Sequence, residues 1–122
     1  MKRLLSLAIC LSTFFIMQSK DWVVDSIDGI YYEIDENTQT ALVKGADENI
    51  TSAMIQSTVV AKDTRYDTKT QTYIVKETKT FPVTCIGRGY NDFAFANCTK
   101  LTSVNIPNSI THIKANAFSG CI

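Results

Sequence analysis

Hydrophobic and polar residues alternate in short runs over most of the chain after residue 19, and this alternation is typical of half-buried β-strands. The first run, Ser26–Ile34, is rich in Ile and Tyr and ends at the polar segment Asp35–Thr38. Residues 39–44 then resume the β-rich pattern. Because a short polar turn between two such runs favours a hairpin, we predict antiparallel pairing of these two segments.

A second pair of β-rich runs lies at residues 57–62 and 72–76, with polar turn formers between them at residues 63–71. No stretch after residue 19 has a sustained helical period. The sequence therefore predicts a mainly β fold, whose residues 20–80 form a region rich in β-hairpins.

The N-terminus has the layout of a secretory signal peptide. A cationic start, Met1-Lys2-Arg3, precedes the apolar run Leu4–Met17, which is shorter than the roughly 20 residues of a membrane-spanning helix. We expect residues 1–19 to be removed by cleavage after Ser19, a small residue. Lipidation at Cys10 is disfavoured because the bulky Ile9 precedes it. The mature chain is then predicted to have no transmembrane helix.

Removal of this segment changes the charge and the cysteine count. The full chain has twelve basic and twelve acidic residues, and loss of Lys2 and Arg3 leaves an excess of two acids. Without a basic patch, a nucleic-acid partner is not expected. The three remaining cysteines, Cys85, Cys98 and Cys121, are an odd number, which argues against a closed disulfide framework.

The last forty residues contain an internal repeat. Its equivalent pairs Phe95/Phe118 and Cys98/Cys121 are both 23 residues apart, whereas Val83/Ile110 and Ile86/Ile113 are both 27 apart. The difference of four places a short insertion in the first unit, within residues 88–92. Between the units lies Leu101-Thr102-Ser103-Val104-Asn105-Ile106, whose L-x-x-V-x-I spacing is the strand pattern of leucine-rich repeats.

These motifs resemble the BspA-like leucine-rich repeats of exported proteins from host-associated bacteria and some parasitic protists. The resemblance is carried by Val83–Gly87, Ala94–Cys98, Leu101–Ile113 and Ala117–Cys121, and more weakly by the upstream Gly29-Ile30-Tyr31-Tyr32. It implies a short solenoid over residues 81–122, with an insertion in the first repeat and a truncated second repeat. Residues 20–80 would form its N-terminal cap.

Each repeat has too few apolar residues to form a core alone, so stacked neighbours are expected to complete it. Phe95 should stack on Phe118 and Cys98 on Cys121, one coil apart at roughly the 4.8 Å spacing of strands. The expected structural core of the repeat is Val83, Ile86, Phe95, Cys98, Leu101, Val104, Ile106, Ile110, Ile113, Phe118 and Cys121.

No catalytic, metal or cofactor residues are predicted. Cys98 and Cys121 could form a disulfide or a metal site, but equivalent ladder positions point the same way, which favours buried thiols over a bond. No CxxC motif or His cluster accompanies them. His112, the single histidine, is interpreted as an exposed strand residue because the sequence places no nucleophile or orienting partner for it.

The resemblance implies a protein that is secreted or held at the cell surface, is not an enzyme, and binds or adheres to a protein of the host or of a partner cell. The outward residues Ser103, Asn105, Thr111 and His112, with Tyr90 in the insertion, are the predicted interaction surface. An alternative is a glycan-binding accessory module of a secreted polysaccharide-handling system, which would use aromatics such as Trp22 and Tyr66. A secreted hydrolase is a third reading, disfavoured by the absence of a nucleophile motif.

The second unit stops at Cys121-Ile122 without a cap, whereas a solenoid usually has three or more repeats. We therefore expect an N-terminal fragment, about one and a half repeats long, of a longer reading frame. An immediate stop codon after codon 122 in the native gene would contradict this. Should the protein end there, the open repeat predicts self-association.

Overall fold

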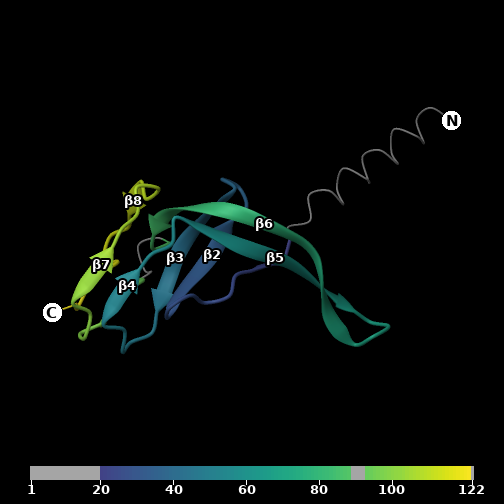
Figure 1. Cartoon of the computed structure of the whole chain (residues 1–122), viewed down its shortest axis with the longest axis horizontal. Coiled ribbons are helices and arrows are strands. Elements are labelled where there is room, and N and C mark those ends of the chain that lie inside the picture. The colour runs from purple at the N-terminus through teal and green to yellow at the C-terminus, as the bar shows by residue number, and fades with distance from the viewer. Residues whose placement is uncertain (1–19, 89–92, 122) are drawn as a thin grey trace.

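A computed structural model describes residues 20–88 and 93–121, which form eight β-strands and no α-helix (Figure 1). The prediction of a mainly β fold is confirmed. The predicted signal peptide and Tyr90 lie outside the described residues. The strands are β1 (Trp22–Val23), β2 (Ile30–Asp35), β3 (Thr40–Ala46), β4 (Ser52–Met54), β5 (Thr58–Asp67), β6 (Thr72–Ile86), β7 (Ser103–Asn105) and β8 (His112–Ile113).

The first predicted hairpin is present as β2 and β3. Their antiparallel register runs from Ile30↔Ala46 to Asp35↔Thr40, with an irregularity at Tyr31/Tyr32. In the turn, the Asp35 carboxylate accepts a hydrogen bond from the backbone N–H of Asn37 at 3.0 Å. This local bond explains why a polar segment stops the strand here.

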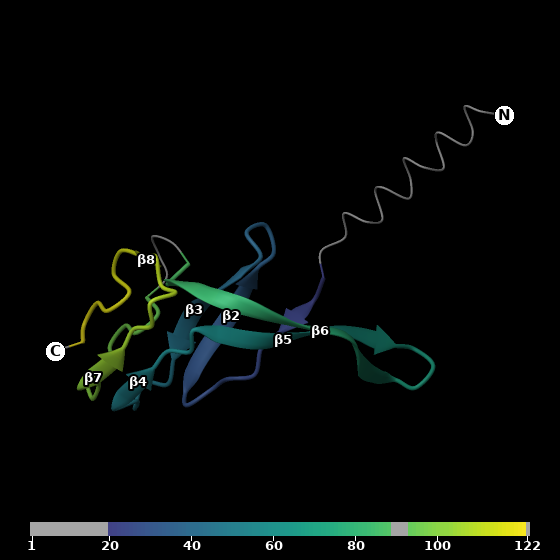
Figure 2. The same ribbon diagram turned by 45° about the horizontal axis from the view of Figure 1, so that its top comes forward.

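The second predicted hairpin is also present, and it is longer than expected. β5 and β6 pair antiparallel from Thr58↔Pro82 to Asp67↔Thr72. Residues 63–67, expected in the turn, belong to β5, because pairing with β6 overrides their polar character. The outer half of this hairpin extends away from the rest of the protein in both ribbon views (Figures 1 and 2).

The C-terminal end of β6 joins the hairpins to the repeats. Over its last residues, β6 pairs in parallel with β3 on one side, through Ala41↔Val83, and with β8 on the other, through Cys85↔His112. The mixed sheet has the order β1-β5-β6-β3-β2, with β8 beside β6. A separate two-stranded sheet is formed by β4 and β7, which are parallel with Ser52↔Ser103.

These parallel pairs define three stacked coils: residues 41–56, residues 83–88 with 93–106, and residues 110–121. The second and third coils each have a turn, at residues 94–97 and 115–120, and we call these turns the corner. There the Phe95 N–H donates to the Ala117 carbonyl at 2.7 Å. The Phe95 and Phe118 rings are stacked, with centroids 5.0 Å apart and an interplanar angle of 1°. The predicted stacking of these two phenylalanines, one 23-residue repeat apart, is therefore confirmed.

The core lies where the coils stack on the sheet. Of the expected repeat core, four residues are fully buried: Val83, Ile86, Phe95 and Cys98. Five more are half-buried and pack against the core: Leu101, Val104, Ile110, Phe118 and Cys121.

Two expected core residues are exposed, and the prediction was wrong for them. Ile106 and Ile113 have 42% and 51% of their surface accessible. Ile106 follows β7 in the second coil, and Ile113 lies on β8 in the third. Their side chains are exposed because no further described strand stacks beside β7 or β8.

Candidate functional site

The sheet of β4 and β7 presents a polar ladder to solvent. Each contact joins residues 51 apart in the sequence: the Ser103 and Ser52 hydroxyls lie 3.1 Å apart, and the Asn105 amide donates to the Met54 sulfur at 3.0 Å. All four side chains are exposed. They point outward because Ala53 and Val104, between them, point into the coils, as the strand period of two requires. We call Ser52, Met54, Ser103 and Asn105 the ladder face.

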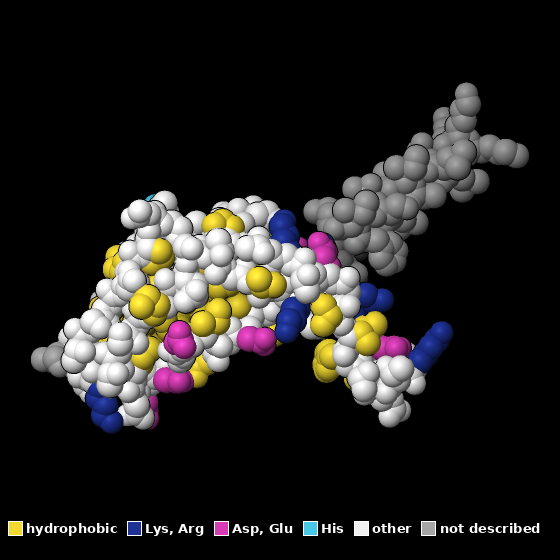
Figure 3. All heavy atoms as spheres, viewed as in Figure 1, with side chains coloured by type: hydrophobic (Ala, Val, Ile, Leu, Met, Phe, Trp, Pro, Cys, Tyr) yellow, Lys and Arg dark blue, Asp and Glu magenta, His cyan; other side chains and the backbone are white. Residues whose placement is uncertain are grey.

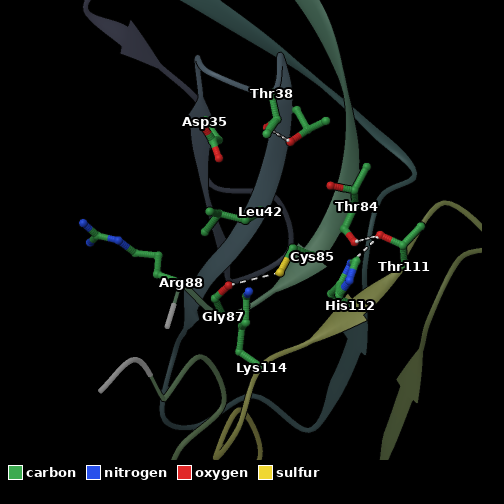
Figure 4. Close-up of a pocket in the computed structure, with 11 residues that line it drawn as sticks. Asp35, Thr38, Leu42, Thr84, Cys85, Gly87, Arg88, Thr111, His112 and Lys114 are labelled. Carbon is green, nitrogen blue, oxygen red and sulfur yellow. Dashed lines mark hydrogen bonds between the residues drawn. The ribbon is translucent and has the colours of Figure 1, made fainter. Parts of the chain in front are cut away.

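The predicted residues Thr111 and His112 lie elsewhere, beside a pocket of approximately 430 Å³ over β3, β6 and β8 (Figure 4). The Thr111 backbone N–H donates to the Thr84 carbonyl at 2.8 Å, and its hydroxyl lies 2.9 Å from His112 Nδ1. These bonds fix the rim of the pocket. The sequence grouped Thr111 and His112 with Ser103 and Asn105, whereas the structure places the two pairs on different sheets.

Charged groups of both signs line this pocket. Arg88 forms an ion pair with Glu33 at 3.3 Å, and the Asp35 carboxylate also lines the pocket. Lys114 points toward Cys85 (Figure 4). A mixed lining of this kind suits a polar ligand with both donors and acceptors.

The thiol in the pocket is not an activated nucleophile. Burial raises the pKa of Cys85 above its ordinary value of 9.0, and the nearby Lys114 opposes this only in part. The thiol donates to the Gly87 carbonyl at 3.3 Å. Since the thiolate is the reactive form, a raised pKa leaves Cys85 in its inert state at neutral pH.

The two repeat thiols are free, as favoured from the sequence. Cys98 is 1% exposed, and its pKa is raised by burial, with smaller contributions from Cys121 and Glu48. The Cys121 thiol donates to the Phe95 carbonyl at 2.8 Å. These contacts assign both side chains to packing of the corner. Within residues 20–88 and 93–121, no three His, Cys, Asp or Glu side chains are grouped to hold a metal ion.

Trp22 does not present a flat aromatic platform to solvent. It is half-buried and packs edge-on against Phe81, with ring centroids 5.1 Å apart and an interplanar angle of 77°. Exposed tyrosines do occur at Tyr66 and Tyr73, far out on the β5–β6 hairpin.

Sequence reasoning missed half of the ladder face. The sequence analysis predicts no strand at Ile50-Thr51-Ser52-Ala53-Met54-Ile55, although this segment aligns without gaps with Leu101-Thr102-Ser103-Val104-Asn105-Ile106. The shared pattern of an aliphatic residue, Thr-Ser, a small apolar residue and Ile was the available signal. It was hidden because the β5–β6 hairpin separates this first coil from the second and lengthens the interval to 51 residues.

Within the part of the chain that the structure describes, no helix is long and apolar enough to cross a membrane.

Residues 78–122 match the family model described as "BspA type Leucine rich repeat region (6 copies)". A similar solved structure is that of a leucine-rich repeat protein from Bacteroides ovatus, which is 21% identical with a TM-score of 0.41. That match covers 79% of this chain and 33% of the other, so the chain spans about a third of its length. No curated protein matches the chain significantly. Residues 78–122 therefore form a BspA-type leucine-rich-repeat region.

Proposed function

We propose that this chain is an exported, non-catalytic protein that binds an extracellular protein on a host or partner cell through the ladder face. Its repeat belongs to a family whose members are generally surface proteins implicated in binding. The observation that carries the proposal is the alignment of exposed side chains from two coils in one parallel sheet. Such an array offers a flat surface with a fixed spacing, which suits a protein partner.

The composition of the ladder face supports a specific contact. Two serines and an amide supply hydrogen bonds, and Met54, 47% exposed, supplies an adaptable apolar contact beside Asn105. No charged side chain belongs to the ladder face, so little desolvation of charge accompanies binding. Tyr90 remains a proposed contributor from the inserted segment.

The test is binding of the full chain to a panel of immobilised extracellular-matrix proteins and to a glycan array. Ser103→Arg places a bulky charge on the ladder face, and we expect it to abolish binding to the panel protein that the wild-type chain recognises. His112→Arg makes the same kind of change at an exposed position of β8 and serves as the matched control. Thermal unfolding of both variants would check that the fold is intact.

Three outcomes would overturn the proposal. If His112→Arg abolishes binding and Ser103→Arg does not, the pocket over β3, β6 and β8 is the binding site. Binding to glycans alone would favour the glycan-binding accessory module. If both variants still bind as the wild type does, neither the ladder face nor the pocket is the binding site.

Export rests on residues 1–19, and the proposed division places the cap at residues 20–80 and the repeats at residues 81–122. Mass spectrometry of the exported protein should find an N-terminus at Lys20. A mature chain that retains Met1 would contradict cleavage after Ser19. The boundary at residue 80 falls inside β6, so the cap and the repeats share one continuous strand.

Self-association through the last coil belongs to the same proposal. Ile106, which directly follows β7, and Ile113, on β8, are exposed, and stacking of a second copy would cover them. Size-exclusion chromatography should detect a concentration-dependent dimer that Ile113→Lys prevents. A monomer at all concentrations would contradict this part.

A further inference from the structure

The β5–β6 hairpin is a projecting ribbon that lacks a core over its outer half. We call residues 58–82 the arm. From Thr72 to Thr80, every side chain of β6 is exposed except that of Ile74, which is half-buried. This stretch is nevertheless rich in β-branched and aromatic residues, which suit the half-buried surface of a β-sheet. A two-stranded ribbon alone is only marginally stable in water, so this composition favours a third strand.

One edge of β6 is open along this stretch. β5 pairs with residues 72–82 on one side, while β3 joins the other side only from Val83 onward. The described chain supplies no other partner for residues 72–80 on that side. An open edge of this kind carries unpaired backbone N–H and C=O groups.

The direction of each backbone group on this edge follows from one hydrogen bond. The Val83 N–H donates to the Ser57 carbonyl at 2.8 Å, so residue 83 points its backbone toward the β5 side. Alternation along an antiparallel pair then turns Glu77 and Lys79 toward β5, and Thr78 and Thr80 toward the open edge. Pro82, which has no N–H, also lies at an outward position, where its missing donor costs no ladder bond.

The charge of the arm selects the kind of strand that fits. The arm has five basic residues and three acidic ones, whereas residues 21–48 hold eight of the twelve acids. Two of the three acids of the arm already have partners, because Asp63 is buried beside Arg65 and Glu77 pairs with Lys20. Of the five basic residues, Lys62 and Arg65 are in ion pairs, which leaves a positive balance. Lys76 forms no ion pair within the described residues.

We propose that the open edge of β6, from Thr72 to Thr80, binds an extended acidic segment of a partner protein as an added strand. Backbone groups at Thr78 and Thr80 hold the segment. Its carboxylates are attracted by the charges of Lys76 and of Lys79, whose Nζ also donates a hydrogen bond to Gln39. Val75 and Tyr73, 54% and 70% exposed, give its alternate side chains an apolar surface. Figure 3 shows hydrophobic side chains gathered on the projecting hairpin. Lysines on an edge oppose pairing between two copies, which favours an acidic partner over a second copy. This site is separate from the ladder face.

The test uses the full chain and a short synthetic peptide of alternating glutamate and valine. Binding is measured by fluorescence anisotropy at low salt, and amide hydrogen exchange locates it. We expect new protection at Thr78 and Thr80, with no change at Glu77 and Lys79, whose amides already face β5. A peptide of alternating lysine and valine is the control probe and should not bind.

Two pairs of variants separate backbone pairing from charge. Thr78→Pro removes an outward N–H and should abolish peptide binding, whereas Thr78→Ala keeps the N–H and should bind as the wild type does. The double variant Lys76→Glu/Lys79→Glu should weaken binding by about tenfold or more. Lys44→Glu, at an exposed position of β3, should leave it unchanged.

Several results would overturn the proposal. They are equal binding of the lysine peptide, protection elsewhere in the chain, or unchanged affinity for Thr78→Pro. A dimer that Thr78→Pro dissociates would assign the edge to a second copy instead. Because the readout does not involve Ser103, failure here would leave the ladder-face proposal standing, and the reverse also holds.

Discussion

The most direct test of the stacked coils is removal of the Phe95 side chain. Phe95 is 0% exposed and lies against Phe118, whose ring is parallel to it at 5.0 Å. Truncation of a buried phenylalanine to alanine costs about 3–5 kcal/mol, since the transfer of the ring from water and the contacts around the cavity are both lost. We therefore expect Phe95→Ala to lower the free energy of unfolding by this amount.

Two other phenylalanines in the corners provide matched controls. Phe118 is half-buried, so Phe118→Ala should cost about 1–2 kcal/mol, from partial burial and the lost ring contact. Phe93 is 46% exposed, and Phe93→Ala should change stability by no more than about 0.5 kcal/mol. The expected loss of stability is largest for Phe95, smaller for Phe118 and smallest for Phe93, because their side chains are buried to a decreasing extent in this order.

Urea denaturation followed by circular dichroism would measure these differences, and thermal unfolding would give the same order. For a chain of this size, the Tm of Phe95→Ala should fall by roughly 12 °C or more. A cost below about 1.5 kcal/mol, or one no larger than that of Phe93→Ala, would show that the corner does not close the core as described.

Three further changes test other parts of the structure. Gly120 has φ +78°, and a Cβ there would clash with Asn97 Oδ1, so Gly120→Ala should cost about 1–2 kcal/mol in thermal unfolding. A Cβ on Gly45 would meet ordinary contacts of 3.7 Å, so Gly45→Ala should be nearly neutral. Asp63→Ala removes a buried carboxylate that accepts a backbone N–H at 3.0 Å, so amide exchange next to β1 should quicken and stability should fall by about 1–3 kcal/mol. Burial raises the pKa of Cys98 above 9.0, so protonation of this thiol stabilises the fold below pH 9.0, and stability should fall as the pH rises above that value. Cys98→Val should reduce this loss in thermal unfolding above pH 9.0, and an unchanged pH profile would contradict the assignment.

Much of the repeat could be predicted from the residues themselves. The recurrence of Phe and Cys after 23 residues, together with the L-x-x-V-x-I strand, predicted the stacking that Phe95 and Phe118 display. Both hairpins were also predictable, because polar turn formers separate alternating runs. Local pattern was sufficient here because each of these features depends on residues close in the sequence, or on an identical motif.

The length of the second hairpin was not predictable in this way. Residues 63–67 have turn-like side chains, yet they continue β5, since β6 lies alongside and Asp63 finds a backbone donor near β1. Polar composition favours a turn only when no partner strand satisfies the backbone. For a similar reason, the predicted interaction residues lie at two separate places. β7 and β8 are only a few residues apart in the sequence, yet β7 pairs with β4 and β8 pairs with β6.

The residue pattern alone is enough to predict the period of the repeat, the identity of its stacked side chains and the β class of the fold. Which strands are neighbours depends on long-range packing. This packing places Ser52–Met54 beside Ser103–Asn105, leaves Ile106 and Ile113 exposed, and extends the outer half of the arm into solvent. The reason is that alternation specifies which face of a strand is apolar but carries no information on its partner. Partners are selected by long-range pairing and packing, which depend on the whole chain.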